Sequence, residues 1–223
     1  MDRSRLDAAR EALLYAGRRL GARGLIAAGE GNLSIRVDVD RILVTPTGRH
    51  KDELVADDLV VVWLGHPERE NQSPSGQTPT SDLAIHLAVY EARPDIGAVA
   101  HAHLPASMAL TLAGELPDPS ALPETSISLP RLPFVAFAVP GSADLAGRVA
   151  AALTEGPEPF ATAVLLERHG AIAVGDRPVQ AVDRLELVEV LCRTWRDALL
   201  IRAARAAVGI VSLPSQGSQS EGA

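Results

Sequence analysis

Short apolar segments typical of strands alternate with helical segments along most of this 223-residue chain. The segment LVVVWL at 59–64 is nearly continuously apolar, which is typical of a buried strand. Six further segments are predicted to be strands, namely 33–37, 41–45, 96–103, 134–139, 162–167 and 171–175. Helical periodicity predicts helices over 4–22, from Thr80 or Ser81 to Pro94, over 105–113, from Ser142 to about Leu153, and from Asp176 and Pro178 onward. Residues 65–79 and the proline-rich segment 114–133 are predicted to be irregular.

The composition predicts one globular domain with an aliphatic core. Apolar residues make up 47% of the chain and charged residues 22%, whereas aromatic residues make up only 3%. The core is therefore built from Ala, Val, Leu and Ile, whose shapes suit close packing of helices on a sheet. We expect a single domain over 1–213 and a disordered tail over 214–223, because the tail contains no core residues.

The charge of the chain limits its partners. A net charge of -7 and a pI near 5.4 argue against nucleic acids and membrane surfaces as partners. The first residues contain no apolar signal-peptide core, and no segment approaches the roughly 18 apolar residues of a spanning helix. The single cysteine, Cys192, excludes an internal disulfide and a cysteine-rich metal site. We therefore expect a cytoplasmic protein in which histidines and carboxylates hold any metal.

Three histidines are candidate metal ligands. His101 and His103 are two residues apart on a predicted strand, so both rings project from the same face. Two neutral imidazoles there can share a divalent cation, although a pair of partly exposed polar residues is an equal alternative. His169 lies at a His-Gly pair between two apolar segments and, taken alone, is more typical of a structural histidine. Together the three leave a fourth position open, as in catalytic zinc sites.

Asp82 and the residues before it form a second candidate site. Asp82 is in the first turn of a predicted helix, where a carboxylate is favoured even without a function, and His86 is assigned no role. The hydroxyls of Thr80 and Ser81 lie beside free N–H groups of that helix start, which suits a phosphate, although helix capping also explains them.

Two loops have the small and polar residues that allow a backbone to approach an oxyanion. They are GEGNLS at 29–34 and TPTGRH at 45–50. Gly, Asn and Thr are also ordinary turn residues, so neither loop is specific by itself.

The order of the motifs carries a specific resemblance. The chain resembles the class II aldolase/adducin head family from about residue 6 to about residue 200, and within it is most similar to L-fuculose-1-phosphate aldolase. The motifs are GNLS at 31–34, TPTG at 45–48, PTSD at 79–82, AVAHAH at 98–103 and LLERHG at 165–170. The resemblance implies an α/β fold, a three-layer α/β/α sandwich with a central, mainly antiparallel sheet. It also implies a homotetramer with active sites between subunits.

The resemblance further implies the role of each site residue. One Zn²⁺ per subunit would be bound by His101, His103 and His169, and Asp82 would be the acid/base carboxylate. The phosphate of a small phosphorylated sugar would be bound by Asn32, Thr47, Gly48, Thr80 and Ser81. The implied reaction is zinc-dependent cleavage of a ketose 1-phosphate, such as L-fuculose 1-phosphate, to dihydroxyacetone phosphate and an aldehyde through an enediolate.

The sequence departs from the aldolase pattern at two places. The family's aldolases typically have Glu at the position of Asp82, whereas L-ribulose-5-phosphate 4-epimerases have Asp. The aldolases also use a Tyr from a neighbouring subunit as proton donor, yet no Tyr follows Leu104, and Glu124 is our candidate substitute. The alternatives are an epimerase, a methylthioribulose-phosphate dehydratase or other sugar-phosphate lyase, and a non-catalytic binding module like the adducin head. The three histidines argue against the last.

Overall fold

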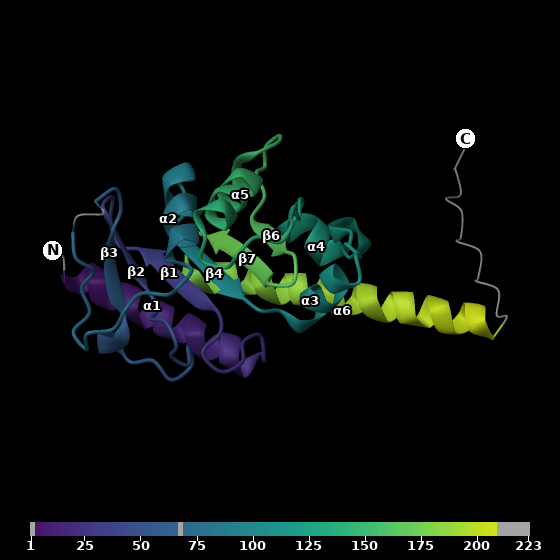
Figure 1. The fold of residues 1–223 in the computed structure, drawn as a ribbon, viewed down its shortest axis with the longest axis horizontal. Coiled ribbons are helices and arrows are strands. Elements are labelled where there is room, and N and C mark those ends of the chain that lie inside the picture. The colour runs from purple at the N-terminus through teal and green to yellow at the C-terminus, as the bar shows by residue number, and fades with distance from the viewer. Residues whose placement is uncertain (1–2, 67–68, 209–223) are drawn as a thin grey trace, which may run out of the picture.

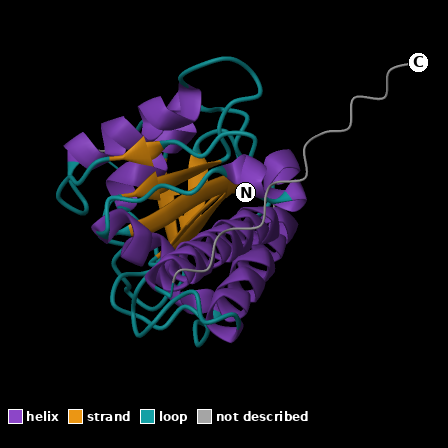
Figure 2. Ribbon diagram, turned by 90° about the vertical axis from the view of Figure 1, so that its right-hand side faces the viewer, coloured by secondary structure: helices purple, strands orange, loops and turns teal. Residues whose placement is uncertain are grey.

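The computed structural model describes residues 3–66 and 69–208, which form a central sheet with helices against both of its faces (Figures 1 and 2). The sheet has seven strands in the order β3-β2-β1-β4-β7-β6-β5. The strands are β1 (Asn32–Arg36), β2 (Arg41–Val44), β3 (Val60–Trp63), β4 (Ala98–Ala102), β5 (Phe134–Val135), β6 (Ala163–Leu166) and β7 (Gly170–Gly175).

Neighbouring strands of this sheet pair antiparallel, except that β5 is parallel to β6 at one edge. The predicted α/β class is therefore confirmed. The predicted mainly antiparallel sheet is confirmed in part, because the parallel edge pair of β5 and β6 makes the sheet a mixed one.

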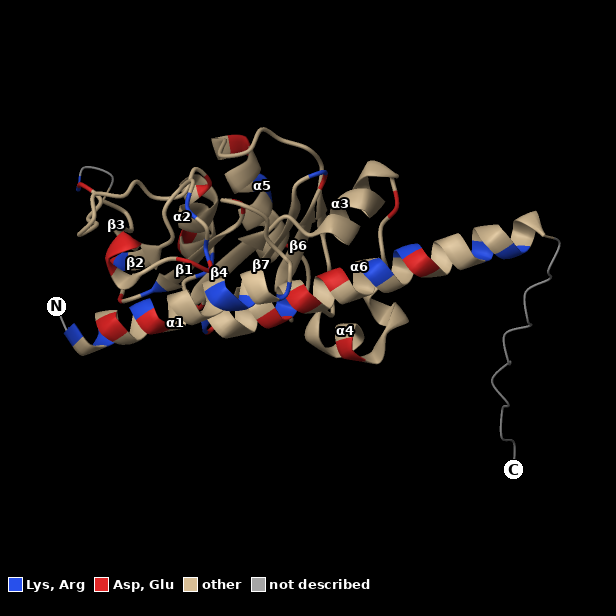
Figure 3. Ribbon diagram, turned by 90° about the horizontal axis from the view of Figure 1, so that it is seen from below, with Lys and Arg blue, Asp and Glu red and all other residues tan. Residues whose placement is uncertain are grey.

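Two apolar cores cover the two faces of the sheet. Helices α1, α3 and α6 contribute to one core, α4 packs against α6, and helices α2 and α5 form the other core. The bounds of these helices are α1 (Arg3–Ala22), α2 (Leu83–Ala92), α3 (Pro105–Leu112), α4 (Pro123–Ser128), α5 (Ala143–Thr154) and α6 (Pro178–Ala207). The last of them extends beyond the sheet and carries acidic and basic side chains along its length (Figure 3).

The alternation of side chains along the central strand β4 places His101 on one face of the sheet. Ala100 and Ala102 lie in the core beneath α1 and α6, whereas Val99 lies in the core formed by α2 and α5. Because side chains alternate along a strand, His101 projects to the same side as Val99, toward α2. Its side chain is only 1% exposed.

The proline-rich segment differs from its prediction. Within 114–133 the chain forms a short 3-10 turn over Pro119–Ala121 and then α4, whose first residue is Pro123. A proline is tolerated at the first helical position, because the N–H that it lacks has no partner within the helix. The strand predicted over 134–139 is limited to β5.

Other predictions concern the ends of the chain and membranes. The tail predicted over 214–223 lies outside the described residues, and the single domain over 1–213 stays a prediction. Among the residues that the structure describes, no helix combines the length and hydrophobicity that crossing a membrane requires.

Candidate metal and substrate site

Three histidines from two strand ends converge at one end of the sheet. His101 lies in β4, His103 follows its last residue, and His169 lies in the turn before β7. The ring centroids are 5.0 Å apart for His101 and His103, 4.7 Å for His101 and His169, and 4.8 Å for His103 and His169. One nitrogen from each ring lies within 4.8 Å of the other two. The structure thus brings together the three side chains that the sequence predicted as metal ligands.

A close approach between two strands brings His169 to the other rings. Ala102 of β4 pairs with Ala171 of β7, and Gly170 begins β7 with a φ of +96°. A Cβ atom at Gly170 would lie 2.1 Å from the Ala102 carbonyl oxygen and 2.8 Å from the Cα of His103. Only glycine fits this position, so the His-Gly pair noted in the sequence has a steric cause.

The nitrogen atoms inside this trio fit a divalent cation. His101 Nδ1 donates to the Ala171 carbonyl at 3.0 Å, which leaves the lone pair of the ring on Nε2. That Nε2 atom and His169 Nδ1 are both buried and have no hydrogen-bond partner. Burial, followed by repulsion from His169 and His103, lowers the pKa of His101 to about 3, and burial also lowers the pKa of His169. Neutral imidazoles with unpartnered nitrogens are the donor set that Zn²⁺ and similar cations bind.

The carboxylate of Asp82 faces this centre instead of capping its helix. Asp82 is the N-cap residue of α2, yet its side chain makes no capping hydrogen bond. Its Oδ2 accepts a hydrogen bond from Asn32 Nδ2 at 2.9 Å and lies 3.9 Å from His101 Nε2. Its Oδ1 is buried without a partner. The predicted N-cap at Thr80 or Ser81 is therefore corrected to Asp82, and helix capping does not explain where its carboxylate lies.

A cavity of about 260 Å³ lies beside the histidines and Asp82. It is lined by all five residues predicted to bind phosphate and also by Asp82 and two of the histidines, namely Asn32, Thr47, Gly48, Thr80, Ser81, Asp82, His103 and His169. The backbone N–H groups of Thr47 and Thr80 already donate to Thr78 and Thr45. An anion in this cavity would therefore be held by hydroxyls and by the remaining backbone amides.

Lys51 also lines this cavity, although its sequence context does not indicate a binding residue. Its ammonium donates to the carbonyls of Gly29 at 2.8 Å and Arg49 at 2.6 Å, which joins the loop 29–34 to the loop 45–50. Burial lowers the pKa of Lys51 to about 8. The ammonium of Lys51 therefore lies against both loops that the sequence predicts to approach an oxyanion. Lys51 is the only lysine of the chain, which was the one available signal.

Glu124 is not brought to this cavity within the single chain. It lies in the exposed first turn of α4 and does not line the cavity. Its role as proton donor stays a prediction.

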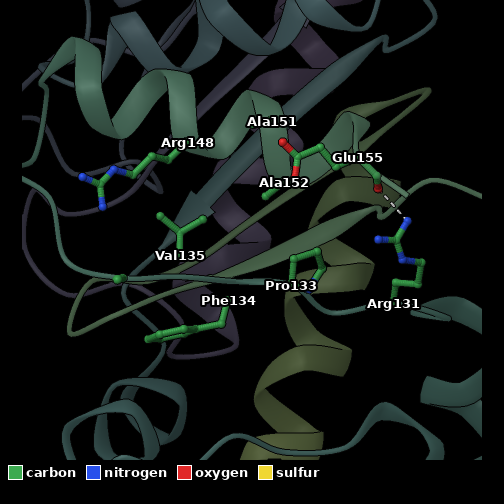
Figure 4. Close-up of a pocket in the computed structure, with 9 residues that line it drawn as sticks. Arg131, Pro133, Phe134, Val135, Arg148, Ala151, Ala152 and Glu155 are labelled. Carbon is green, nitrogen blue, oxygen red and sulfur yellow. Dashed lines mark hydrogen bonds between the residues drawn. The ribbon is translucent and has the colours of Figure 1, made fainter. Parts of the chain in front are cut away.

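A larger hollow of about 340 Å³ lies between β5 and α5 (Figure 4). Its two arginines already have partners, since Arg131 donates to the Glu155 carbonyl at 2.7 Å and Arg148 pairs with Asp144 at 2.9 Å. No histidine lines this hollow. The side chains of this hollow therefore provide fewer groups for metal binding or catalysis than those of the smaller cavity.

The fold and the site together define an α/β protein with a three-histidine centre suited to a divalent cation. The chain belongs to the family described as the Class II Aldolase and Adducin N-terminal domain, whose model matches residues 11–196. The resemblance inferred from the order of the motifs is therefore confirmed.

Individual members of the family show how varied its reactions are. The chain is 36% identical over 188 residues to the methylthioribulose-1-phosphate dehydratase of Acidiphilium cryptum, which covers 80% of this chain and 85% of that protein. It is 29% identical over 186 residues to the 3-oxo-tetronate 4-phosphate decarboxylase of Haemophilus influenzae, which covers 82% and 84%. The crystal structure of L-fuculose-1-phosphate aldolase from Thermus thermophilus matches with a TM-score of 0.72 and 29% identity, over 91% of this chain and 98% of that one.

Proposed function

We propose that this chain is a zinc-dependent lyase that acts on a small phosphorylated ketose through an enediolate. The observation that carries the proposal is the pair of buried, unpartnered nitrogens, His101 Nε2 and His169 Nδ1, in a site where Asp82 Oδ1 is also buried and unpartnered. Buried polar atoms without partners are rare in folded proteins, so a site with three of them is explained by a bound cation and a substrate.

The proposed roles of the protein groups follow from what each can donate or accept. Thr47, Gly48, Thr80 and Ser81 would hold the phosphate, and the charge of Lys51 would attract it. The Asn32 amide is engaged by Asp82 and His86, which leaves one Nδ2 hydrogen for a ligand. A phosphate held at one end of the substrate fixes the orientation of the reacting carbons.

The histidines and Asp82 would divide the chemistry between them. His101, His103 and His169 would hold Zn²⁺, because three imidazoles with an open position are typical of catalytic zinc. When bound, the cation supplies Lewis-acid stabilisation of negative charge that develops on the substrate oxygens. We assign proton transfer to Asp82 Oδ1, since no hydrogen bond occupies that oxygen.

Two fates of a ketose 1-phosphate are compatible with this arrangement. In dehydration, the base removes the proton from C3 and the hydroxyl of C4 leaves with a proton as water. In aldol cleavage, the base removes the proton of the C4 hydroxyl and the C3–C4 bond breaks. Both reactions place the developing charge on C3 and the carbonyl oxygen of C2, where the same site would stabilise it. Loss of CO₂ from a 3-oxo acid generates a carbanion of the same kind.

Dehydration of methylthioribulose 1-phosphate or a similar ketose 1-phosphate is our first candidate. It is supported by relatives of that name at 36% and 32% identity. Aldol cleavage, as in L-fuculose-1-phosphate aldolase, is the second candidate and is supported by the likeness to the Thermus thermophilus structure. The absence of Tyr after Tyr90 weighs against the second candidate, because the family's aldolases use a Tyr as proton donor.

We further propose a cytoplasmic homotetramer with sites between subunits. In such an assembly, the exposed Glu124 of a neighbouring chain would supply the acid that the leaving hydroxyl requires. Light scattering of the purified protein tests the assembly. A monomer at micromolar concentration would contradict it.

The function is tested by incubating the zinc-loaded protein with methylthioribulose 1-phosphate and a panel of ketose 1- and 5-phosphates. Mass spectrometry would detect loss of water, a coupled reductase assay would detect dihydroxyacetone phosphate, and chromatography would detect an epimer. We expect dehydration to be the fastest reaction and chelation to abolish it. A zinc-loaded protein that converts no member of the panel would contradict the proposal and would favour a non-catalytic binding module.

A further inference from the structure

A chain of buried hydrogen bonds leads from the protein interior to Asp82. The hydroxyl of Tyr90 lies 2.9 Å from Ser34 Oγ, which lies 2.7 Å from His86 Nδ1. His86 Nε2 lies 2.6 Å from Asn32 Oδ1, and Asn32 Nδ2 donates to Asp82 Oδ2 at 2.9 Å. None of the five residues is more than 6% exposed. Ser34, His86 and Tyr90 do not line the cavity, so they reach it only through Asn32 and Asp82.

The chain results from the periodicities of two elements. Asn32 and Ser34 are two residues apart in β1, so they point to the same face of the sheet. Asp82 is the N-cap of α2, and His86 and Tyr90 follow it at intervals of four residues, so the three side chains lie along one side of that helix. This side of α2 lies against β1, so successive residues of the hydrogen-bonded series come alternately from the helix and from the strand.

The direction of each hydrogen bond follows from the carboxylate. An ionised carboxylate only accepts, so Asn32 presents its amide nitrogen to Asp82 and its oxygen to His86. His86 must therefore carry its hydrogen on Nε2. Burial lowers the pKa of His86 to about 4, against the opposite effect of Asp82, so the ring is neutral and its Nδ1 accepts from Ser34. The hydroxyl of Ser34 in turn accepts from Tyr90.

We propose that His86 is a positioning residue, which holds Asn32 in the one orientation that leaves Asp82 Oδ1 free for proton transfer; this inference rests on the proposed function. With Nε2–H in place, Asn32 occupies Oδ2 and the other oxygen stays available. Without that donor, the Asn32 oxygen is buried and unpaired, and the amide can turn over and place its oxygen against the carboxylate.

The position of the hydrogen on His86 tests the inference without any activity measurement. Neutron diffraction from crystals of perdeuterated, zinc-loaded protein locates deuterium on histidine rings and amides directly. We expect deuterium on His86 Nε2 and none on Nδ1, with the Asn32 amide nitrogen facing Asp82. Deuterium on Nδ1 alone, or on both nitrogens, would overturn the inference.

Kinetics test whether His86 acts through Asp82. We expect His86→Leu to lower kcat by about 10- to 100-fold with little change in KM or zinc content, as when other buried supports of a site are removed. His86→Gln retains an N–H for Asn32 and should recover most of the loss. Val89→Ala is the control for lost packing, because Val89 is fully buried in the same helix but is not one of the five hydrogen-bonded residues.

The double variant separates positioning from general stability. In an Asp82→Asn background, His86→Leu should reduce kcat by less than about twofold, because the group that it positions is already lost. An undiminished loss in that background, or a His86→Leu protein with normal kcat, would overturn the inference. If the wild-type protein converts no ketose phosphate, the proposed function alone fails, and the neutron result still decides the orientation.

Discussion

Replacing Gly170 with alanine tests how the metal centre is assembled. The added Cβ would lie 2.1 Å from the Ala102 oxygen, whereas real Cβ atoms keep at least 3.0 Å, so the strand ends must separate by about 0.9 Å. Binding sites tolerate displacements of about 0.5 Å, and His169 is the residue next to the change. We therefore expect the affinity for zinc to fall by about 10- to 100-fold.

The same substitution also affects stability. Gly170 has a φ of +96°, and a side chain in such a region costs about 1–3 kcal/mol. For a chain of this size, Tm would fall by about 2–4 °C for each kcal/mol. Competition with a chromogenic chelator would measure zinc affinity, and differential scanning calorimetry would measure Tm.

Gly147→Ala is the matched control for this experiment. Gly147 lies inside α5, and a Cβ there would have no neighbour within 4 Å. We expect this control to raise stability by up to about 1 kcal/mol and to leave zinc affinity unchanged. A Gly170→Ala protein with normal zinc affinity and normal Tm would refute the steric argument.

Three further predictions concern single side chains. Asp82→Asn should lower kcat by about 10²- to 10⁴-fold while zinc content stays normal; full turnover would remove Asp82 from the reaction. Lys51→Met should raise KM for a phosphorylated substrate by about 10-fold, with thermal unfolding as the check on folding; an unchanged KM would contradict a role in attraction. Burial depresses the pKa of His86 from 6.5 to about 4, so between these pH values the unfolded chain binds a proton that the folded chain does not. The free energy of unfolding should therefore fall as pH drops from 6.5 to 4, by at most about 3 kcal/mol. Urea unfolding across that range should show a weaker pH dependence for His86→Gln.

The periodicities in the sequence were sufficient to predict most helices and strands and two of the three candidate metal ligands. The spacing of His101 and His103 placed both rings on one face, and α1, β3 and α2 lie close to their predicted ranges. Local sequence could not show that β7 approaches β4 closely enough to bring His169 beside them. Only the order of the family motifs connected the third histidine to the pair.

Other features depend on burial, which a sequence does not specify. The sequence does not indicate a role for Lys51, because nothing in its neighbours shows that its ammonium is enclosed by two loops. His86 was assigned no role, because an Asp and a His four apart are common on exposed helix faces. Its importance follows from Ser34 and Asn32 on a strand far away in the sequence. The prolines of the segment 114–133 predict irregular structure, although Pro123 begins α4.

Anomalous diffraction at the zinc absorption edge, from crystals of protein loaded with one equivalent of zinc, tests the three-histidine site most directly. We expect one peak per chain at about 2.0–2.1 Å from a nitrogen of each of His101, His103 and His169. His169→Ala should lose the peak. A zinc peak held elsewhere, or no peak between the three rings, would contradict the site and the chemistry proposed for it.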